Sequence, residues 1–114
     1  MKKILALFVL LSSLCFAHSD LMMGNLDKAV EIQFSGNPED AIQFLDYLVN
    51  DDNTNNEDKV HYLILISNIN HSIGNIKRQE YDMIKLKILI NKFEECKKEL
   101  EKFYPLYFNY LLDT

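Results

Sequence analysis

The chain has 114 residues, of which 48% are hydrophobic and 25% are charged, and its formal net charge is −5 at neutral pH. A chain of this length forms one domain at most. Its acidic character, without any basic stripe that carries interleaved aromatic residues, argues against a nucleic-acid partner.

The first 17 residues have the three parts of a secretory signal peptide, in the usual order. Lys2 and Lys3 supply the positive start, residues 4–14 form an apolar run, and residues 15–17 have the small-x-small form of a cleavage site. Cleavage there would leave Cys96 as the only cysteine, so no internal disulfide could form.

Two alternatives to cleavage fit the residues less well. The apolar run is shorter than the roughly 20 residues that cross a bilayer, which argues against a retained spanning anchor. Lipid attachment at Cys15 requires a small residue just before the cysteine in bacterial lipoproteins, and here that residue is Leu14. We therefore expect a periplasmic or secreted protein, whose single domain spans residues 18–114 and has no stable membrane span.

The first part of this domain predicts two amphipathic helices. Apolar side chains recur at three- and four-residue steps from Leu21 to Phe34. Gly36 ends this helix, and Asn37 caps the next one, with Pro38 in its first position. The second helix places its apolar residues on one face: Ala41, Phe44, Leu45, Leu48 and Val49.

A polar loop over residues 51–57 separates the second helix from the third. The third helix begins near Asp58 and ends at Gly74, after which Asn75 caps the next helix. We expect its inward face to include Val60, Leu63, Ile64 and Ser67.

The stretch from residue 76 to residue 104 predicts one long helix, because it contains no Gly or Pro until Pro105 stops it. Tyr81, Ile84 and Ile88 add apolar surface to its back, so we expect its first half to be covered on two sides. We also expect the other helices to pack against this long helix. Its core face would consist of Ile76, Met83, Leu86, Leu89, Ile90, Phe93, Cys96, Leu100, Phe103 and Tyr104.

The tail after Pro105 predicts a short fifth helix. The fold class is therefore all-α, with four helices in consecutive antiparallel hairpins and a short C-terminal helix. Five aromatic residues occur within eight positions at this end, a density that suits either core closure or an exposed patch that binds a partner. The candidate partner-binding residues are Tyr104, Tyr107, Phe108 and Tyr110.

Two similar strings, residues 36–42 and residues 74–80, each join one helix to the next at a spacing of 38 residues. The first, Gly-Asn-Pro-Glu-Asp-Ala-Ile, resembles the turn and second-helix start of a tetratricopeptide repeat, and Ala29 and Ser67 stand at the family's small position in the first helix. The resemblance covers about residues 21–90 and implies a scaffold that binds peptides or proteins. The sequence departs from the family in its period, which is about 34 there, and at Asn25, Lys28, Asn70 and Gln79.

No residue set in the sequence predicts a catalytic site. Cys96 has no histidine at a spacing that would place a base beside it, and we interpret it as a buried small side chain rather than an exposed thiol that links two chains. Glu94, Glu95 and Glu99 alternate with lysines at helical spacing, which is typical of a solvated face.

The sequence likewise predicts neither a metal site nor a cofactor site. Residues 51–55 copy the first three ligand positions of a calcium-binding loop, but Tyr62 falls where the bidentate glutamate must be. His18 could bind copper at a mature N-terminus only with a second histidine of fixed geometry. His61 and His71 lie about 15 Å apart on one predicted helix, so they cannot both join such a site.

These observations predict an exported protein that binds another protein or a second copy of itself and performs no catalysis. The alternative is a carrier that holds a small apolar ligand between the long helix and the third helix. An enzyme would need a polar pocket around Cys96 or a histidine, which the sequence gives no reason to expect.

Overall fold

The structure is a computed structural model of the chain, and it describes residues 20–113. Within that range the chain is helical and contains no strand, which confirms the all-α prediction. The proposed signal peptide, residues 1–17, lies outside the described residues. The helices are α2 (Asp20–Phe34), α3 (Pro38–Asn50), α4 (Asn56–Ser72), α5 (Ile76–Lys92), α6 (Glu94–Phe103) and α7 (Pro105–Leu112).

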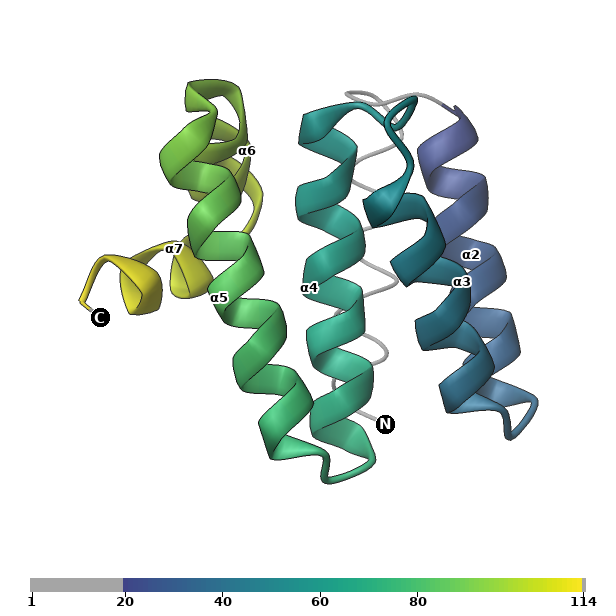
Figure 1. Ribbon diagram of the computed structural model, residues 1–114. Coiled ribbons are helices and arrows are strands. Elements are labelled where there is room, and N and C mark those ends of the chain that lie inside the picture. The colour runs from purple at the N-terminus through teal and green to yellow at the C-terminus, as the bar shows by residue number, and fades with distance from the viewer. Residues whose placement is uncertain (1–19, 114) are drawn as a thin grey trace.

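Successive helices from α2 to α5 lie side by side and run in alternating directions, as Figure 1 shows. The turns between them follow from local chemistry. Gly36 and Gly74 both have positive φ, 90° and 76°, the conformation that closes a helix most easily at glycine. The Asn75 side chain caps α5 by accepting a hydrogen bond from the Arg78 backbone N–H, whereas the Asn37 side chain makes no such bond to α3.

The predicted continuous helix from residue 76 to residue 104 is wrong, because the chain turns at Phe93. Phe93 has an extended backbone, with φ −126° and ψ 119°, and it separates α5 from α6. A straight helix over this stretch would be about 44 Å long, whereas the longest dimension of the described molecule is 35 Å. The turn lets α6 pack against both α4 and α5 instead of extending beyond them.

The helix against which the others pack is α4, and not the stretch that the sequence pattern favoured. Ten of its 17 residues are buried, and it contacts α2, α3, α5 and α6. Its predicted inward residues are buried, but so are His61, Tyr62 and Leu65 on its other sides. A helix with neighbours on several sides has no polar face to present to water.

The apolar back of α5 is not covered by the described residues, which corrects a second expectation. Tyr81, Ile84 and Ile88 are 55%, 59% and 60% exposed, and Ile76 from the predicted core face is 51% exposed. The helix α5 is therefore buried along one face only. Its other side exposes these apolar side chains to solvent.

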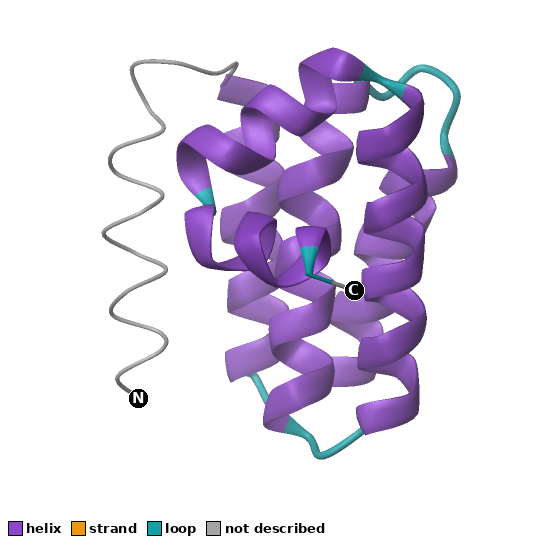
Figure 2. Ribbon diagram, turned by 90° about the vertical axis from the view of Figure 1, so that its left-hand side faces the viewer, coloured by secondary structure: helices purple, strands orange, loops and turns teal. Residues whose placement is uncertain are grey.

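The C-terminal helix α7 forms after Pro105, as predicted, and packs mainly on α6. Figure 1 shows it projecting from the bundle beside α5, and Figure 2 shows it lying across the helices that face the viewer. Among the helices of residues 20–113, none is long and apolar enough to cross a membrane.

Candidate functional site: the groove between α5 and α7

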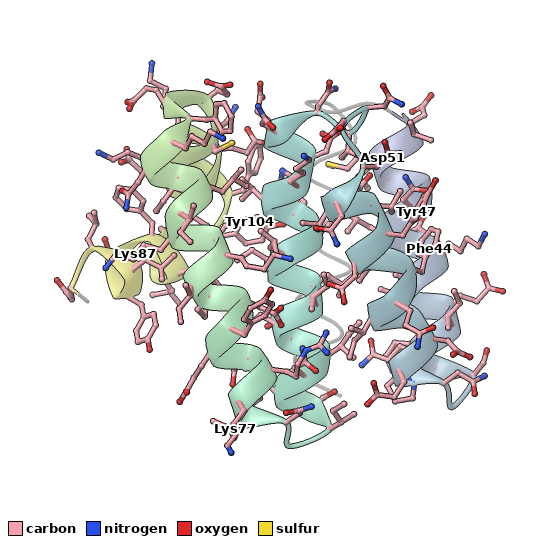
Figure 3. The ribbon with its side chains drawn as sticks, viewed as in Figure 1. Phe44, Tyr47, Asp51, Lys77, Lys87 and Tyr104 are labelled. Carbon is pink, nitrogen blue, oxygen red and sulfur yellow. The ribbon has the colours of Figure 1, made fainter. Side chains whose placement is uncertain are left out.

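The four aromatic residues that the sequence predicted as candidate partner contacts differ in their exposure to solvent. Tyr104 and Phe108 are only 9% and 8% exposed and belong to the core, whereas Tyr110 is 58% exposed. Figure 3 places Tyr104 between the ribbons of α5 and α4. Tyr107 is half-buried, and its hydroxyl donates a hydrogen bond of 2.6 Å to Asn68 Oδ1 of α4.

A groove of about 730 Å³ runs between α5 and α7. It forms because α7 packs chiefly on α6 and leaves the neighbouring face of α5 uncovered. Glu80 and Lys87 supply charges from the α5 wall. Most of its lining is apolar and comes from both helices: Ile76, Met83, Ile84, Leu106, Tyr110 and Leu111.

Several of these apolar residues are open to solvent to an unusual degree. Leu106 is 83% exposed, and Ile84 is 59% exposed on the facing wall. Single exposed apolar side chains are common on protein surfaces, but a contiguous patch marks a place where a protein or another apolar surface binds. From the aromatic tail the groove therefore contains Tyr107 and Tyr110, together with Ile76 and Met83 of α5, which the sequence pattern had assigned to the core face.

A buried chain of hydrogen bonds lies elsewhere, between α4 and α6. His61 Nε2 is 2.6 Å from Glu99 Oε2, and His61 Nδ1 is 2.7 Å from the Tyr104 hydroxyl. The expectation that Glu99 lies on a solvated face is wrong, because this residue is only 8% exposed. The turn at Phe93 directs the Glu99 side of α6 toward α4, which no helical spacing could reveal.

The Tyr104 hydroxyl keeps its proton within this series of hydrogen bonds. Burial, with the negative charge of Glu99 as a further cause, raises the pKa of Tyr104 well above its ordinary value. Its hydroxyl therefore keeps its proton and can donate it to His61 Nδ1, while His61 Nε2 faces the Glu99 carboxylate on the other side of the ring. The residues lining the α5–α7 groove do not include these three. Their hydrogen bonds join α4 to α6.

A second buried polar pair joins α4 to α5. Asn70 Nδ2 donates to Asp82 Oδ2 at 2.7 Å, and both residues are 1% exposed. The other side-chain oxygens, Asn70 Oδ1 and Asp82 Oδ1, have no hydrogen-bond partner within the described structure. Burial raises the pKa of Asp82, and the bond from Asn70 opposes this only in part. Asn70, a departure from the repeat pattern, thus has a packing role.

Cys96 is fully buried, which agrees with its interpretation as a small core side chain. Burial raises the pKa of its thiol to about 12, and the charge of Glu95 adds to the effect. The thiolate, which is the nucleophilic form, is therefore scarce at neutral pH. Among residues 20–113, no group of histidine, cysteine and acidic side chains could hold a metal ion; His18 lies outside them.

Neither a protein-family model nor a curated protein nor a solved structure matches the chain. Its function is therefore inferred from the geometry of the described residues.

Proposed function

We propose that the protein is exported and acts by binding a partner protein, which inserts an amphipathic helix into the groove between α5 and α7. The observation that carries this proposal is the continuous apolar lining that two helices expose together. Covering Ile84, Leu106 and Tyr110 would remove apolar surface from water, at about 25 cal/mol for each Å² buried.

The shape and charge of the groove favour a helical occupant. The groove is open along the surface, so a continuous segment can lie in it, as in complexes that place apolar anchors at i, i+3, i+4 and i+7 in a groove. Glu80 and Lys87 lie two helical turns apart on α5. They suit a partner helix that carries both signs of charge beside its apolar stripe.

Two features of the sequence support the same proposal. The likeness of residues 21–90 to tetratricopeptide repeats implies a scaffold that binds peptides or proteins, and helices stacked in order along the chain suit such a scaffold. The lysines, apolar run and small-x-small end of residues 1–17 support export to the periplasm or the medium.

The test combines crosslinking with affinity measurement on the mature chain. A photo-crosslinking amino acid at position 106 should capture the partner in native cells, whereas the same group at position 21, on the exposed Leu21 of α2, should not. The captured protein is then purified, and its Kd is measured against wild type, Ile84→Glu with Leu106→Glu, and a control that combines Leu21→Glu with Tyr47→Glu.

We expect the groove variant to weaken binding at least about 100-fold, because each glutamate would be desolvated in an apolar interface. We expect the control to bind within about threefold, because Leu21 and Tyr47 lie on α2 and α3, away from the groove. A peptide from the crosslinked segment should gain helicity on binding. Equal affinities of the groove variant and the control variant for the partner, or a crosslink to a second copy of the chain, would refute the proposal.

A further inference from the structure

A second recess, of about 530 Å³, lies where α3 ends, α4 begins and α5 ends. Its apolar lining comes from all these elements and includes Val49, Leu63, Ile88, Leu89 and Phe93. Leu63 and Val49 are buried beneath it, whereas Ile88 is 60% exposed at its side. This volume lies within the range of about 300 to 1,000 Å³ that small-molecule sites occupy.

The charged residues of the recess are unusual for this chain. The whole protein has a formal charge of −5, yet the recess contains Lys59, Lys85 and Lys92 against a single acid, Asp52. Within the described residues, none of the three lysines forms an ion pair with an acidic side chain. Three lysines that line one recess raise its electrostatic potential, which favours the binding of an anion.

Two of these lysines lie against aromatic rings. The Lys85 ammonium lies 5.4 Å from the centroid of the Tyr81 ring, and the Lys92 ammonium lies 5.4 Å from that of Phe93. A ring face attracts a cation without supplying a full negative charge. Both ammonium groups can therefore still donate hydrogen bonds to a carboxylate, which would be charge-assisted.

We propose that this recess binds a long-chain carboxylate of the fatty-acid type. Its hydrocarbon chain lies against Leu63, Leu89 and Phe93, and its carboxylate lies among the three lysines. This site is separate from the α5–α7 groove, so it does not depend on the partner proposed above. The alternative function, a carrier of a small ligand, would use this open recess at one end of α4 and α5. The ligand would then have an anionic head group in addition to its apolar part.

The experiment titrates dodecanoate into the mature chain by calorimetry, below the concentration at which dodecanoate forms micelles. Acetate provides the head group alone, and dodecanol provides the chain without the charge. We expect one dodecanoate per chain, no binding of acetate, and dodecanol binding at least about tenfold more weakly. Equal binding of dodecanol and dodecanoate would overturn the proposal, because the lysines would then have no role.

Two sets of variants test the location. Lys85→Ala with Lys92→Ala should weaken dodecanoate binding at least about tenfold. The control, Lys97→Ala with Lys98→Ala on α6, makes the same change in net charge and should alter dodecanoate affinity less than about twofold. Ile88→Glu should abolish binding by placing a carboxylate in the recess, and Ile88→Gln should retain most of it. Melting temperatures confirm that each variant folds.

Amide chemical shifts supply an independent readout of the site. Dodecanoate should move the signals of Leu63, Leu89 and Phe93 and leave those of Leu106 and Tyr110 in place. Shifts confined to the α5–α7 groove, or equal losses of affinity in the two lysine double variants, would refute this assignment.

Discussion

The imidazole of His61 bridges α4 and α6, because its Nε2 lies 2.6 Å from Glu99 Oε2 while its Nδ1 faces the Tyr104 hydroxyl. All three residues are at least nine-tenths buried, so the hydrogen bonds form in a poorly solvated region where they are stronger than in water. The Phe103 ring lies beside the imidazole, with 5.6 Å between the ring centroids. These contacts hold α6 on the central helix after the chain turns at Phe93.

Glu99→Ala should lower the free energy of unfolding by about 2–3 kcal/mol, because it removes a charged acceptor from a buried imidazole N–H. Glu99→Gln should cost less, since its amide oxygen can still accept this bond. Urea denaturation followed by circular dichroism measures both variants, and Glu101→Ala on the exposed side of α6 provides the control, within about 0.5 kcal/mol of wild type. A loss no larger for Glu99→Ala than for Glu101→Ala would contradict a stabilising role.

The parts of the fold that sequence predicted correctly depend on local chemistry. Gly36 and Gly74 end helices because glycine readily adopts positive φ, and Pro38 and Pro105 begin helices because the first position needs no N–H. The turn at Phe93 has no such local signal. It depends on the burial of Cys96 and Leu100 in the bundle, which a pattern within one helix cannot specify.

The candidate sites show the same limit. The aromatic density of the tail was visible in the sequence, but whether Tyr104 or Tyr110 faces water depends on the path of the chain after Phe93. The spacing of Glu99 among lysines predicted a solvated face. Glu99 is buried because α6 packs against α4, which the spacing cannot indicate. The recess that Lys59, Lys85 and Lys92 line combines residues from α3, α4 and α5, so no single stretch of sequence contains its pattern.

Alanine substitutions in the aromatic tail should separate core residues from surface residues. Phe108→Ala should lower the free energy of unfolding by about 3–5 kcal/mol, because it leaves a cavity where α7 packs on the bundle. Tyr110→Ala should change it by no more than about 0.5 kcal/mol, because this ring is mostly solvated. Urea denaturation compares the two directly. Similar losses for both would mean that Tyr110 also packs in the core.

The hydroxyl of Tyr107 provides a finer test of the same region. Tyr107→Phe should cost about 0.5–1.5 kcal/mol of unfolding free energy, because it deletes the hydrogen bond to Asn68 while keeping the ring. Tyr110→Phe is the matched control and should be neutral. Thermal unfolding of the two variants, recorded side by side, distinguishes them. Equal melting temperatures would show that the bond to Asn68 contributes nothing.

Asp82→Asn should stabilise the protein at neutral pH, by on the order of 1 kcal/mol, by removing a buried carboxylate with an unpartnered oxygen. The folded state raises the pKa of Asp82, so the stability associated with its protonated form is present at low pH and is lost as the pH rises through the folded pKa. The advantage of the variant should therefore shrink as the pH falls. Urea midpoints measured across the acid range would reveal this trend.

Asp27→Asn, at an exposed carboxyl of α2, provides the control for Asp82→Asn and should lack that trend. A difference between wild type and Asp82→Asn that grows toward acid pH would show that the carboxylate of Asp82 is better solvated than the structure indicates.

The Cys96 thiol should react slowly with a disulfide reagent in the folded protein and quickly once the protein is unfolded in urea. Two causes act together, since burial blocks access and raises the thiol pKa to about 12, which leaves little thiolate at pH 8. Labelling rates with 5,5′-dithiobis-(2-nitrobenzoate), with and without urea, measure the difference, and we expect it to exceed about 100-fold. Fast labelling without denaturant, or a disulfide-linked dimer after air oxidation, would show that the α6 region opens readily and that its packing on α4 is weak.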